Sequence, residues 1–397
     1  MRHYIEGSMA VAEAVCLCKP HVISAYPITP QTHIVEDLSQ ITADGKFKGQ
    51  IVNVESEFSA ASVCLGAVAT GARSYTATTS QGLLLMAEVL FNMAGMRLPL
   101  VLTCANRAIS APINIWTDHS DAMALRDCGF IQLYAENNQE AADLHYMAYK
   151  ISEDKEVRLP VMVNMDGFLL THSFEPIEIP TQAEVDAFLP PYQPEHYLTT
   201  KRPLTMGSMV GEDGYMEVRY YLEEAMKKAM PVIERVTNEF KEKFGRFQGV
   251  FVDGYKLEDA DTVIVAIGSV IGTIKDSIDL MRANGLKVGC LKVRTFRPFP
   301  NEAIVNALKN IKNVIVIDRA SSVGNGGILA TEVRSAFYGH TTIPKVNSYI
   351  VGLGGRDITV KTITDIVGAS GVKFEGSQFV ELDKDFMKKG DEYLKTI

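Results

Sequence analysis

Three polar side chains, Thr29, Glu57 and Arg107, follow closely after predicted strands and could act on a ligand. They stand in the stretches AYPITPQT, VNVESE and TCANRA. The carboxyl ends of parallel strands meet at one edge of an open α/β sheet, which is where such sheets bind ligands. An arginine at this edge can hold a substrate carboxylate in a bidentate pair, and free amides at a helix start attract anions. The spacing therefore indicates a ligand site that favours an anion.

Two of these stretches also have purely structural interpretations. Pro27 and Pro30 can shape a strand-to-helix loop, with Pro30 at the first helical position, where its missing N–H costs nothing. Glu57 can serve only as a cap for the helix predicted from the small residues that follow it. The residues alone leave both interpretations open.

Arg107 is followed by several acids and a histidine. A structural ion pair is the commoner fate of an arginine, and the candidate partners are Asp118, Asp121 and Asp127. His119 lies among these acids and could act as a base, but a hydrogen-bonded loop histidine is the favoured interpretation. Substrate binding and structural pairing both stay open for Arg107.

Several turns carry weaker signals. Ser80 and Gln81 begin a helix after another strand, in TSQGLLLM, and offer amides and a carboxamide, but such turns are common. The glycine-rich turns at 321–328 and 351–357 could cradle a phosphate, yet neither completes a nucleotide-binding pattern, so loop geometry is preferred. No Ser-His-Asp or metal-ligand spacing is legible, and no metal site is predicted.

The turn EDGYM at 212–216, with Asn238 downstream, faintly resembles the diphosphate-and-metal motif of thiamine enzymes. In that motif the acidic turn follows a strand and the asparagine lies about one helix later. Here the turn follows a loop, and Asn238 falls inside a predicted amphipathic helix. We therefore reject this motif.

Composition and charge exclude several classes of protein. The 397 residues carry a net charge of −9 and a pI near 5.5, and no basic stripe is visible, which argues against a nucleic-acid partner. No apolar run reaches the roughly 18 residues needed to span a bilayer. MRHYIEGSMAVAEAV lacks the uninterrupted apolar core of a signal peptide. The sequence predicts a cytoplasmic protein without a membrane partner.

The cysteines are scattered, and none forms a CxxC pair. They are Cys16, Cys18, Cys64, Cys104, Cys128 and Cys290. This pattern indicates core thiols in a reducing compartment and no zinc or iron–sulfur site on this chain. If the reaction needs an electron-carrying cluster, another subunit must hold it.

Strand-like and helical patterns alternate along residues 1–172, which predicts a doubly wound α/β domain with a parallel sheet covered on both faces. The strand runs are VISAY, IVNVE, SYTATT, LPLVLTCA, IQLYA and LPVMVNMDGF. Residues 173–250 are predicted to form a proline-rich crossover and a long amphipathic helix, bent or broken near Pro231 and ending at a glycine. A smaller α/β domain with about four parallel strands, one of them KVGCLKVRTF, is predicted over 251–370, and 371–397 is a C-terminal tail.

Seven stretches, in order, resemble the alpha subunits of the 2-oxoacid:ferredoxin oxidoreductase family, in its pyruvate-type form with separate subunits. They are AYPITPQT, VESEFSA, TATTSQGLLLM, NRAISAPINIW, YAENNQEA, FRPFP and VGLGGRD. The resemblance implies a pyrimidine-type thiamine-diphosphate-binding domain followed by a transketolase C-terminal-like domain. Such enzymes decarboxylate a 2-oxoacid oxidatively, transfer the acyl group to coenzyme A and pass electrons through iron–sulfur clusters to ferredoxin.

The same resemblance implies how the cofactors are divided among subunits. Thiamine diphosphate is shared with a beta subunit that holds its diphosphate and Mg²⁺, and [4Fe–4S] clusters lie on partner subunits. The implied partners are beta, gamma and ferredoxin-like delta subunits, ferredoxin and the 2-oxoacid, in a dimer of heteromers, with coenzyme A as co-substrate. The absence of a credible diphosphate motif and of cluster-type cysteines on this chain agrees with that division.

Residue by residue, the resemblance gives each candidate a role. Glu57 matches the glutamate that hydrogen-bonds the aminopyrimidine ring and favours its imino tautomer. Arg107 matches the arginine that binds the substrate carboxylate, and Thr29 matches the threonine beside it. The further cofactor-binding residues by this resemblance are Tyr26, Pro27, Ile28, Ser80 and Gln81.

The substrate is expected to be pyruvate. Oxalate-cleaving relatives carry arginine where this sequence has Thr29, so the neutral residue favours a monocarboxylic oxoacid, and SAPINIW resembles the pyruvate branch. Phe58 is often histidine in relatives, so no proton-transfer role is assigned there. The alternatives are 2-oxoisovalerate or phenylglyoxylate as substrate, a non-catalytic α/β scaffold subunit, and an independent transketolase-type enzyme, which the missing diphosphate motif disfavours. The direction of flux, the number of partner subunits and the residues that contact coenzyme A are not determined by this sequence.

Overall fold

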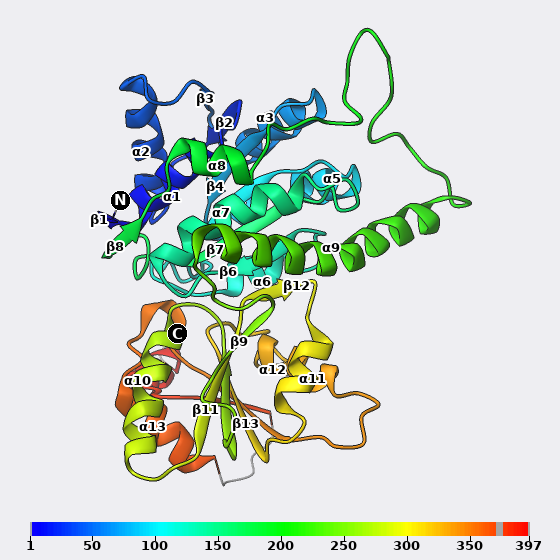
Figure 1. The fold of residues 1–397 in the computed structure, drawn as a ribbon. Helices are drawn as coiled ribbons and strands as arrows, with labels where there is room; N and C mark the ends of the chain where they lie inside the picture. The colour runs from blue at the N-terminus through cyan, green and yellow to red at the C-terminus, as the bar shows by residue number, and fades with distance from the viewer. Residues whose placement is uncertain (1, 371–375, 396–397) are drawn as a thin grey trace.

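The chain folds into two α/β lobes, each built on its own sheet (Figure 1). The structure is a computed structural model that describes residues 2–370 and 376–395. The first lobe holds a seven-stranded sheet and the second a six-stranded sheet. This arrangement confirms the predicted fold class.

The first sheet contains all six predicted strands in parallel pairing. In spatial order its strands are β12 (Thr295–Arg297), β6 (Ile131–Tyr134), β7 (Val161–Asp166), β5 (Val101–Asn106), β4 (Ser74–Thr78), β2 (Val22–Ala25) and β3 (Gln50–Asn53). Strand β4 is wholly buried, as expected for a strand covered on both faces.

Helices cover both faces of this sheet, and its side chains alternate between two cores. Val101 of β5 belongs to the core under helices α1, α2 and α7, whereas Leu102 belongs to the core under α3 to α5. The covering helices are α1 (Gly7–Leu17), α2 (Thr32–Ala43), α7 (Asn138–Ser152), α3 (Glu57–Ala69), α4 (Ser80–Leu85) and α5 (Ala87–Gly95), and the short α6 (Ser120–Ala124) packs beside α4. The close packing of α3 follows from its small residues, since Ala60 and Ala61 are fully buried.

The second sheet has five parallel strands and one antiparallel edge strand. In spatial order they are β15 (Ser377–Phe379), β14 (Lys345–Ile350), β13 (Asn313–Asp318), β10 (Thr262–Ala266), β11 (Val288–Val293) and β9 (Val252–Tyr255). Helices α10 (Val270–Ala283) and α13 (Val360–Ala369) cover one face, and α11 (Asn301–Leu308) and α12 (Ile328–Ala336) cover the other. A short 3₁₀ turn, η1 (Leu353–Gly355), follows β14.

The predicted single strand KVGCLKVRTF is wrong, because the chain divides it between the two sheets. Residues Val288–Val293 form β11 of the second sheet, and Thr295–Arg297 form β12, which pairs antiparallel with β6 of the first. Arg294 lies at the crossing and is buried. Its guanidinium donates to Glu140 and to the carbonyl of Gly249, so the crossing is held by charge as well as by the backbone ladder.

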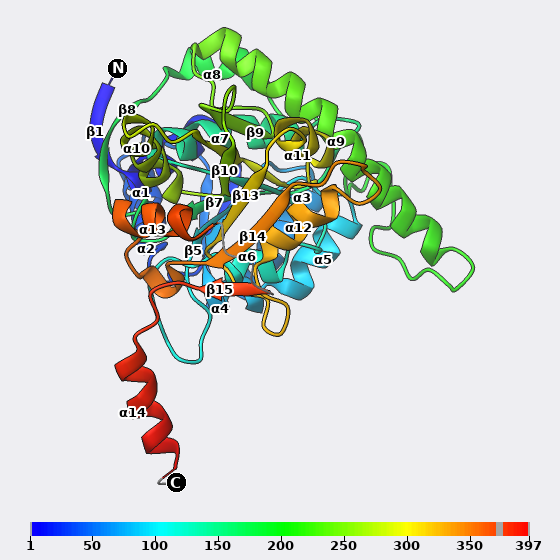
Figure 2. The same cartoon turned by 90° about the horizontal axis from the view of Figure 1, so that it is seen from below.

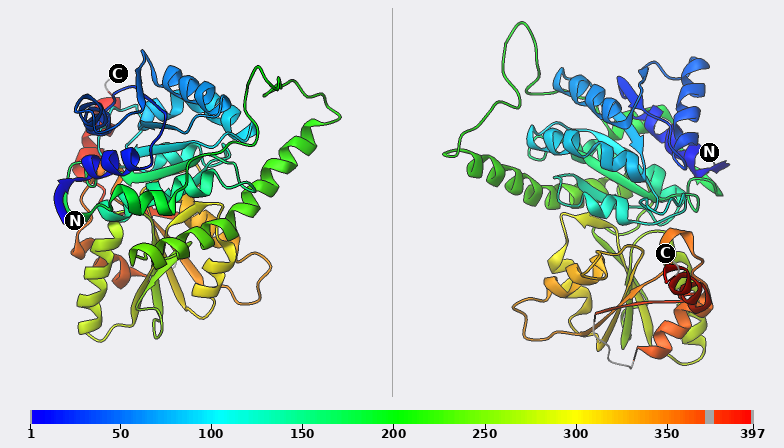
Figure 3. Two further views of the ribbon diagram at one scale, coloured as in Figure 1. Left: turned by 45° about the horizontal axis from the view of Figure 1, so that its top comes forward. Right: turned by 180° about the vertical axis from the view of Figure 1, so that it is seen from behind.

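The segment between the lobes begins with a two-stranded ribbon that the sequence pattern did not reveal. Strand β8 (Phe174–Glu178) pairs antiparallel with β1 (Arg2–Glu6), so the two ends of the first lobe lie side by side. Helix α8 (Gln182–Phe188) follows. The next residues pack on the first lobe, where the Leu198 N–H donates to the Ala69 carbonyl, and the chain then loops out from the body before α9 (Figure 1, Figure 3).

The long helix α9 (Tyr215–Phe244) is continuous, so of the predicted bend or break near Pro231 the break is wrong. Pro231 is exposed, so its ring lies on the solvent side of the helix and not in the core. The helix ends at Gly245 in a left-handed conformation (φ 69°), which confirms the predicted glycine stop.

The C-terminal residues contribute to two different features. Strand β15 joins the second sheet, whereas α14 (Lys384–Leu394) has no buried residue and extends alone from the body (Figure 2). Within the described residues, no helix combines the length and the apolar character required to cross a bilayer. The domain boundaries at 172, 250 and 370 stay a proposal.

A buried charge cluster joins the two lobes. Asp166, the last residue of β7, accepts hydrogen bonds from His119 (2.5 Å) and from Arg319 (2.7 Å), and the backbone N–H of Ser269 donates to it at 3.0 Å. Burial alone would raise the pKa of Asp166, but His119 and Arg319 outweigh it and lower the pKa below its usual range. This network fixes one lobe against the other.

Candidate active site

Four neighbouring strands deliver the predicted site residues to one edge of the first sheet. Strands β5, β4, β2 and β3 are adjacent, and their carboxyl ends lead to Arg107, Ser80, Thr29 and Glu57 respectively. The sheet order therefore gathers residues that lie up to 78 positions apart in the chain. This placement is the one expected for a ligand site in a parallel α/β sheet.

The turn that carries Thr29 is anchored from below by Gln31. The fully buried side chain of Gln31 accepts from the Ile28 N–H (3.2 Å) and donates to the Ala77 carbonyl (2.9 Å). Helix α2 begins at Thr32, so the predicted position of Pro30 as the first helical residue is wrong, because Gln31 occupies the cap position. Thr29 is exposed at the edge of the sheet while its turn is fixed to strand β4.

Arg107 is buried, and within the described residues its guanidinium has no acidic partner. Its Nη1 donates to the Thr29 carbonyl (2.7 Å) and its Nε to the Asn114 carbonyl (3.1 Å). Nη2 lies 3.5 Å from the Gln81 carboxamide oxygen. Burial lowers the pKa of Arg107 because no nearby charge fully offsets the lost hydration. The prediction of a structural ion pair for Arg107 is therefore wrong, because neutral oxygens hold its guanidinium.

Asp121, one of those expected ion-pair partners, organises the backbone of the site. Its buried carboxylate accepts the N–H groups of Ser80 (2.9 Å) and Arg107 (3.0 Å) and the side-chain amide of Asn106 (3.0 Å). Burial raises the pKa of this carboxyl, and these hydrogen bonds oppose the rise. Asp121 thus links α6 to the start of α4 and the end of β5, a role that sequence spacing could not distinguish from pairing with the Arg107 side chain.

Glu57 does not cap its own helix. The cap of α3 is Ser56, whose hydroxyl accepts from the Ser59 N–H at 3.2 Å, so the alternative of a merely capping Glu57 is wrong. The carboxylate points toward the start of α4, because a Cβ built on Gly82 would lie 2.6 Å from Glu57 Oε1 and 2.6 Å from Thr78 Oγ1. Gly82 is thus a residue whose lack of a side chain makes room for Glu57.

The first turn of α4 connects Glu57 to Arg107. Gln81 contacts the Arg107 guanidinium, and Gly82, the next residue, adjoins the Glu57 carboxylate. Ser80 adopts a positive φ of 50° and donates to the Ala108 carbonyl at 2.5 Å. The carboxylate and the guanidinium therefore adjoin two consecutive residues, Gly82 and Gln81.

Several polar atoms at this site lack a partner among the described residues. The buried Gln81 Nε2 and Thr78 Oγ1 form no hydrogen bond, and the side chain of Glu57 has none either. A buried unpaired polar group is costly unless a ligand or water satisfies it. An aminopyrimidine ring offers both donors and acceptors on its edge, so the residues present fit the ring half of thiamine.

The edge of the sheet around the site is open and rich in exposed apolar side chains. Ile113 is 77% exposed, and Tyr26 and Pro27 are exposed beside Thr29. Others that face solvent nearby in the chain are Phe58, Leu85 and Trp116. A separate cavity of about 650 Å³ lies between the lobes, but none of the predicted site residues lines it.

The remaining motifs behave as loops or as rejected candidates. The start of α12 after the 321–328 turn is capped by Asp318, whose carboxylate accepts from the Leu329 and Ala330 N–H groups. Burial raises the pKa of Asp318 to about 7, although the hydrogen bonds from these two N–H groups act to lower it. The 212–216 turn and Asn238 lie near opposite ends of α9, roughly 35 Å apart at 1.5 Å per residue. Their rejection as a diphosphate motif is consistent with this distance.

Comparison with known families covers nearly the whole chain. Residues 13–238 match the model of the pyruvate flavodoxin/ferredoxin oxidoreductase, thiamine diphosphate-binding family, and residues 260–363 match the pyruvate:ferredoxin oxidoreductase core domain II. Several curated relatives are named pyruvate synthase subunit PorA. That of Methanosarcina barkeri is 53% identical over 96% of this chain and 97% of its own length, and that of Methanocaldococcus jannaschii is 51% identical over 91% and 93%.

A relative that is named for another substrate is less similar in sequence. The ketoisovalerate oxidoreductase subunit VorA of Pyrococcus horikoshii is 43% identical over 92% of this chain and 93% of its own. Among solved structures, the 2-oxoglutarate:ferredoxin oxidoreductase of Magnetococcus marinus aligns with a TM-score of 0.68 and 21% identity. The alignment covers 93% of this chain and 65% of that one. A split-gene transketolase aligns with a TM-score of 0.52 and 12% identity over 91% of this chain and 97% of its own, so these two structures support the fold alone.

Proposed function

The chain belongs to the pyruvate flavodoxin/ferredoxin oxidoreductase family, and from this premise we propose that it is the subunit that holds the pyrimidine half of thiamine diphosphate and the carboxylate of pyruvate. In this proposal the complete enzyme oxidatively and reversibly decarboxylates pyruvate to acetyl-CoA and CO₂. The observation that carries the proposal is the buried guanidinium of Arg107, which has no acidic partner in the described part of the chain and contacts Gln81, the residue beside the glycine that adjoins Glu57.

The substrate assignment rests on charge and on similarity. A single buried guanidinium beside a neutral Thr29 matches one carboxylate, and a second carboxylate would find no further cation in these contacts. The relatives named pyruvate synthase subunit are 46–53% identical, against 43% for the two named ketoisovalerate oxidoreductase subunit. Both considerations favour pyruvate.

Each side chain has a task in this proposal. Bound thiamine diphosphate supplies the carbon nucleophile and the electron sink that decarboxylation of a 2-oxoacid needs. Glu57 would accept a hydrogen bond from a ring N–H on the pyrimidine edge and so favour the imino tautomer of the ring. Arg107 and the Thr29 hydroxyl orient the oxoacid, and Gln81 and Ser80 fix the positions of Arg107 and of the loop at Ala108. Tyr26, Pro27 and Ile28 form the wall beside the ring.

The open edge indicates that another chain completes the site. The exposed apolar residues beside the edge, among them Ile113 and Trp116, would be covered by a beta subunit carrying the diphosphate and Mg²⁺. Gamma and delta subunits with [4Fe–4S] clusters, coenzyme A and ferredoxin complete the proposed cytoplasmic complex, as a dimer of heteromers.

The test is a substrate survey on the native complex, purified anaerobically through a tag on this chain. Coenzyme A-dependent reduction of a viologen dye is measured with pyruvate, 2-oxoisovalerate, phenylglyoxylate, 2-oxoglutarate and oxalate. A dominant pyruvate rate is the expected result. A dominant rate with another acid contradicts the substrate assignment, and no turnover in a complex that contains thiamine diphosphate and clusters contradicts the catalytic role.

A further inference from the structure

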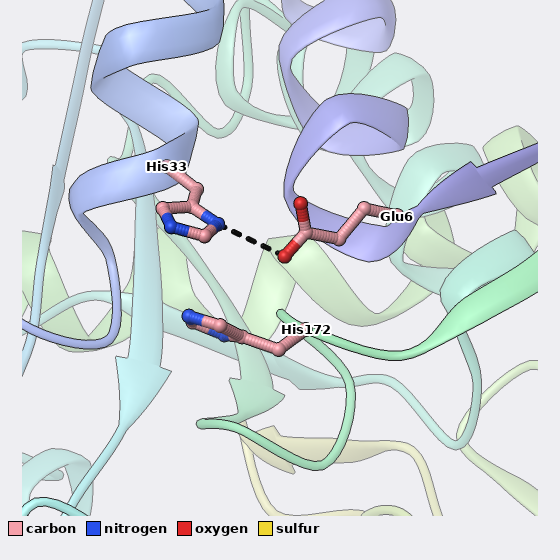
Figure 4. A group of neighbouring side chains, drawn as sticks. All are labelled: Glu6, His33 and His172. Atoms are coloured by element: carbon pink, nitrogen blue, oxygen red, sulfur yellow. Dashed lines mark hydrogen bonds and ion pairs between the residues drawn. The ribbon is translucent and has the colours of Figure 1, made fainter.

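A second group of side chains, Glu6, His33 and His172, gathers beside the first site without any task in the proposed reaction. Glu6 ends β1, His33 lies in the first turn of α2, and His172 lies in the loop between β7 and β8. Figure 4 shows the carboxylate facing the His33 ring, with the His172 ring beneath it. Three separate segments of the fold thus contribute one side chain each.

The geometry of the group is that of a metal-ligand set. One ligand atom from each residue lies within 4.8 Å of the other two, and His33 Nδ1 is 2.9 Å from Glu6 Oε1. Tetrahedral zinc with bonds near 2.0 Å places its ligand atoms about 3.3 Å apart, so small side-chain rotations would close the set. All three residues are partly buried, which leaves an open position for water.

The hydrogen bond behind His172 presents a ring nitrogen suited to a metal. His172 Nδ1 lies 2.7 Å from the Thr171 hydroxyl, which in turn accepts from the Phe168 N–H at 2.9 Å. This bond allows Nδ1 to carry the proton and leaves the Nε2 lone pair free. Metal-ligating histidines commonly have such a partner on the other nitrogen.

Stacked rings hold both histidines in place. The His33 and His172 ring centroids are 4.5 Å apart, the His172 and Phe168 centroids 4.6 Å, and the Phe168 and Trp116 centroids 4.4 Å. The column ends on the loop that also carries Arg107, because the Trp116 carbonyl accepts from the Ala108 N–H. The ligands are therefore preorganised, and they are coupled to the active edge.

A further carboxylate nearby has an oxygen that lacks a partner. Asp37, one turn beyond His33 on α2, has its Oδ2 buried without a hydrogen bond among the described residues. Burial and the negative charge of Glu6 raise the pKa of Asp37 to about 6. A bound cation would offset the repulsion between the two carboxylates.

We propose that Glu6, His33 and His172 bind one divalent late first-row transition metal ion per chain, with Zn²⁺ as the probe. Two imidazoles and one carboxylate suit zinc and its neighbours, whereas Mg²⁺ and Ca²⁺ prefer oxygen ligands throughout. No metal site was predicted from the sequence, because the ligands lie 27 and 139 residues apart and show no local spacing.

The proposed ion would brace the turn that carries Thr29. It would tie the start of α2 to the loop after β7, and that loop already packs on the turn, since a Cβ built on Gly167 would lie 2.7 Å from Pro30 Cγ. The role is positional, because the ligands do not include any residue assigned to the oxoacid or to thiamine.

The test measures metal content and not turnover. The intact complex is treated with chelator, returned to buffer with Mg²⁺, dialysed against graded Zn²⁺ and analysed for bound zinc. We expect one tight zinc per copy of this chain, and an affinity weakened by about 100-fold or more in His33→Gln and His172→Gln, beyond the loss typical of outer-shell changes. His196→Gln and His340→Gln, which alter exposed histidines elsewhere, are the matched controls and should leave binding unchanged.

Zinc K-edge absorption identifies the ligands independently of the iron–sulfur clusters. The expected spectrum shows nitrogen and oxygen near 2.0–2.1 Å and no sulfur near 2.3 Å. Circular dichroism and the unfolding temperature of each variant without metal confirm that it folds. The proposal is overturned if the wild type retains no stoichiometric zinc, if folded His33→Gln and His172→Gln bind it as tightly as the controls, or if the spectrum shows sulfur ligands.

Discussion

Arg107 and Arg294 are both buried arginines, but their surroundings differ in kind. Arg294, 2% exposed at the seam between the lobes, donates to Glu140, which also pairs with Lys292 at 3.2 Å. Arg107 is 6% exposed at the edge of the first sheet, and in the described residues its guanidinium donates only to neutral oxygens. The guanidinium of Arg294 is neutralised by an acid of the same chain, whereas that of Arg107 is left able to bind an anionic ligand.

The same contrast separates the acids of the two regions. Asp166 at the seam accepts from His119, Arg319 and Ser269, whereas Glu57 at the edge has no hydrogen-bond partner among the described residues. Breaking a buried ion pair costs several kcal/mol of stability, while an unpaired polar group is retained where a ligand completes it. Substitutions at the seam should therefore affect folding, and substitutions at the edge should affect turnover.

The largest expected effect is at the edge. In the intact complex, Glu57→Gln should lower kcat with pyruvate by about 10⁴-fold, the upper end of the range for a positioned acid–base group. Because the Glu57 carboxylate forms no hydrogen bond or ion pair within the described residues, the unfolding temperature should stay within a few degrees of the wild type. Viologen reduction and differential scanning calorimetry measure the two quantities.

Glu55→Gln is the matched control, since Glu55 is an exposed neighbour whose carboxylate accepts a hydrogen bond from the Ser59 hydroxyl. A Glu57→Gln complex as active as Glu55→Gln would remove Glu57 from the site. A large fall in unfolding temperature for Glu57→Gln would make the residue structural and erase the contrast with Asp166.

The next effect is at the seam. Asp166→Asn should reduce the free energy of unfolding by about 3–5 kcal/mol, because Arg319 and His119 would stay buried without their anion. Urea unfolding of the complex, followed by circular dichroism, gives the difference. Asp385→Asn, at an exposed position of α14, is the control and should be neutral.

The lowered pKa of Asp166 also predicts how the stability of the fold changes with pH. The folded pKa of Asp166 is below its unfolded value near 3.8, so the stabilisation is present above about pH 4 and is lost as the pH falls through that value toward the folded pKa. Wild type should therefore lose more stability than Asp166→Asn between pH 6 and pH 3. Parallel pH profiles for the two proteins would contradict the assigned role of this carboxylate.

The smallest effect is at the exposed threonine of the edge. Thr29→Val removes one hydroxyl and keeps the shape, so kcat/KM for pyruvate should fall by about 5- to 10-fold, the equivalent of one hydrogen bond. The unfolding temperature should not change, because the turn is held by Gln31 and not by the Thr29 side chain. Thr32→Val, three residues further along in α2, is the control. A Thr29→Val complex with unchanged kcat/KM would exclude a substrate contact by the hydroxyl.

Much of the first lobe could be predicted because its signals are local. Six apolar runs bounded by turns became six parallel strands, and the positions of Thr29, Glu57 and Arg107 after β2, β3 and β5 followed from those runs. Their roles in binding and catalysis stay predictions. The structure excluded two purely structural alternatives. Ser56 and not Glu57 caps α3, and the Arg107 guanidinium donates to neutral oxygens and not to an acid.

The features that were missed depend on long-range pairing. The ribbon of β1 with β8 joins residues 168 to 176 positions apart, and β12 leaves its own lobe to pair with β6. The role of Asp121 depends on which N–H groups the fold brings to it, and no periodicity encodes that. The group of Glu6, His33 and His172 was missed for the same reason, since three separate segments build it.

The most direct test of the central claim is the steady-state kinetics of an Arg107→Met complex with pyruvate. If Arg107 awaits the substrate carboxylate, KM should rise by about 100-fold, added guanidinium should restore part of the loss, and the unfolding temperature should be equal to or above that of wild type, because a buried cation without an acidic partner has been removed. An unchanged KM in a folded complex, or a fall in unfolding temperature as large as that of Asp166→Asn, would contradict the account.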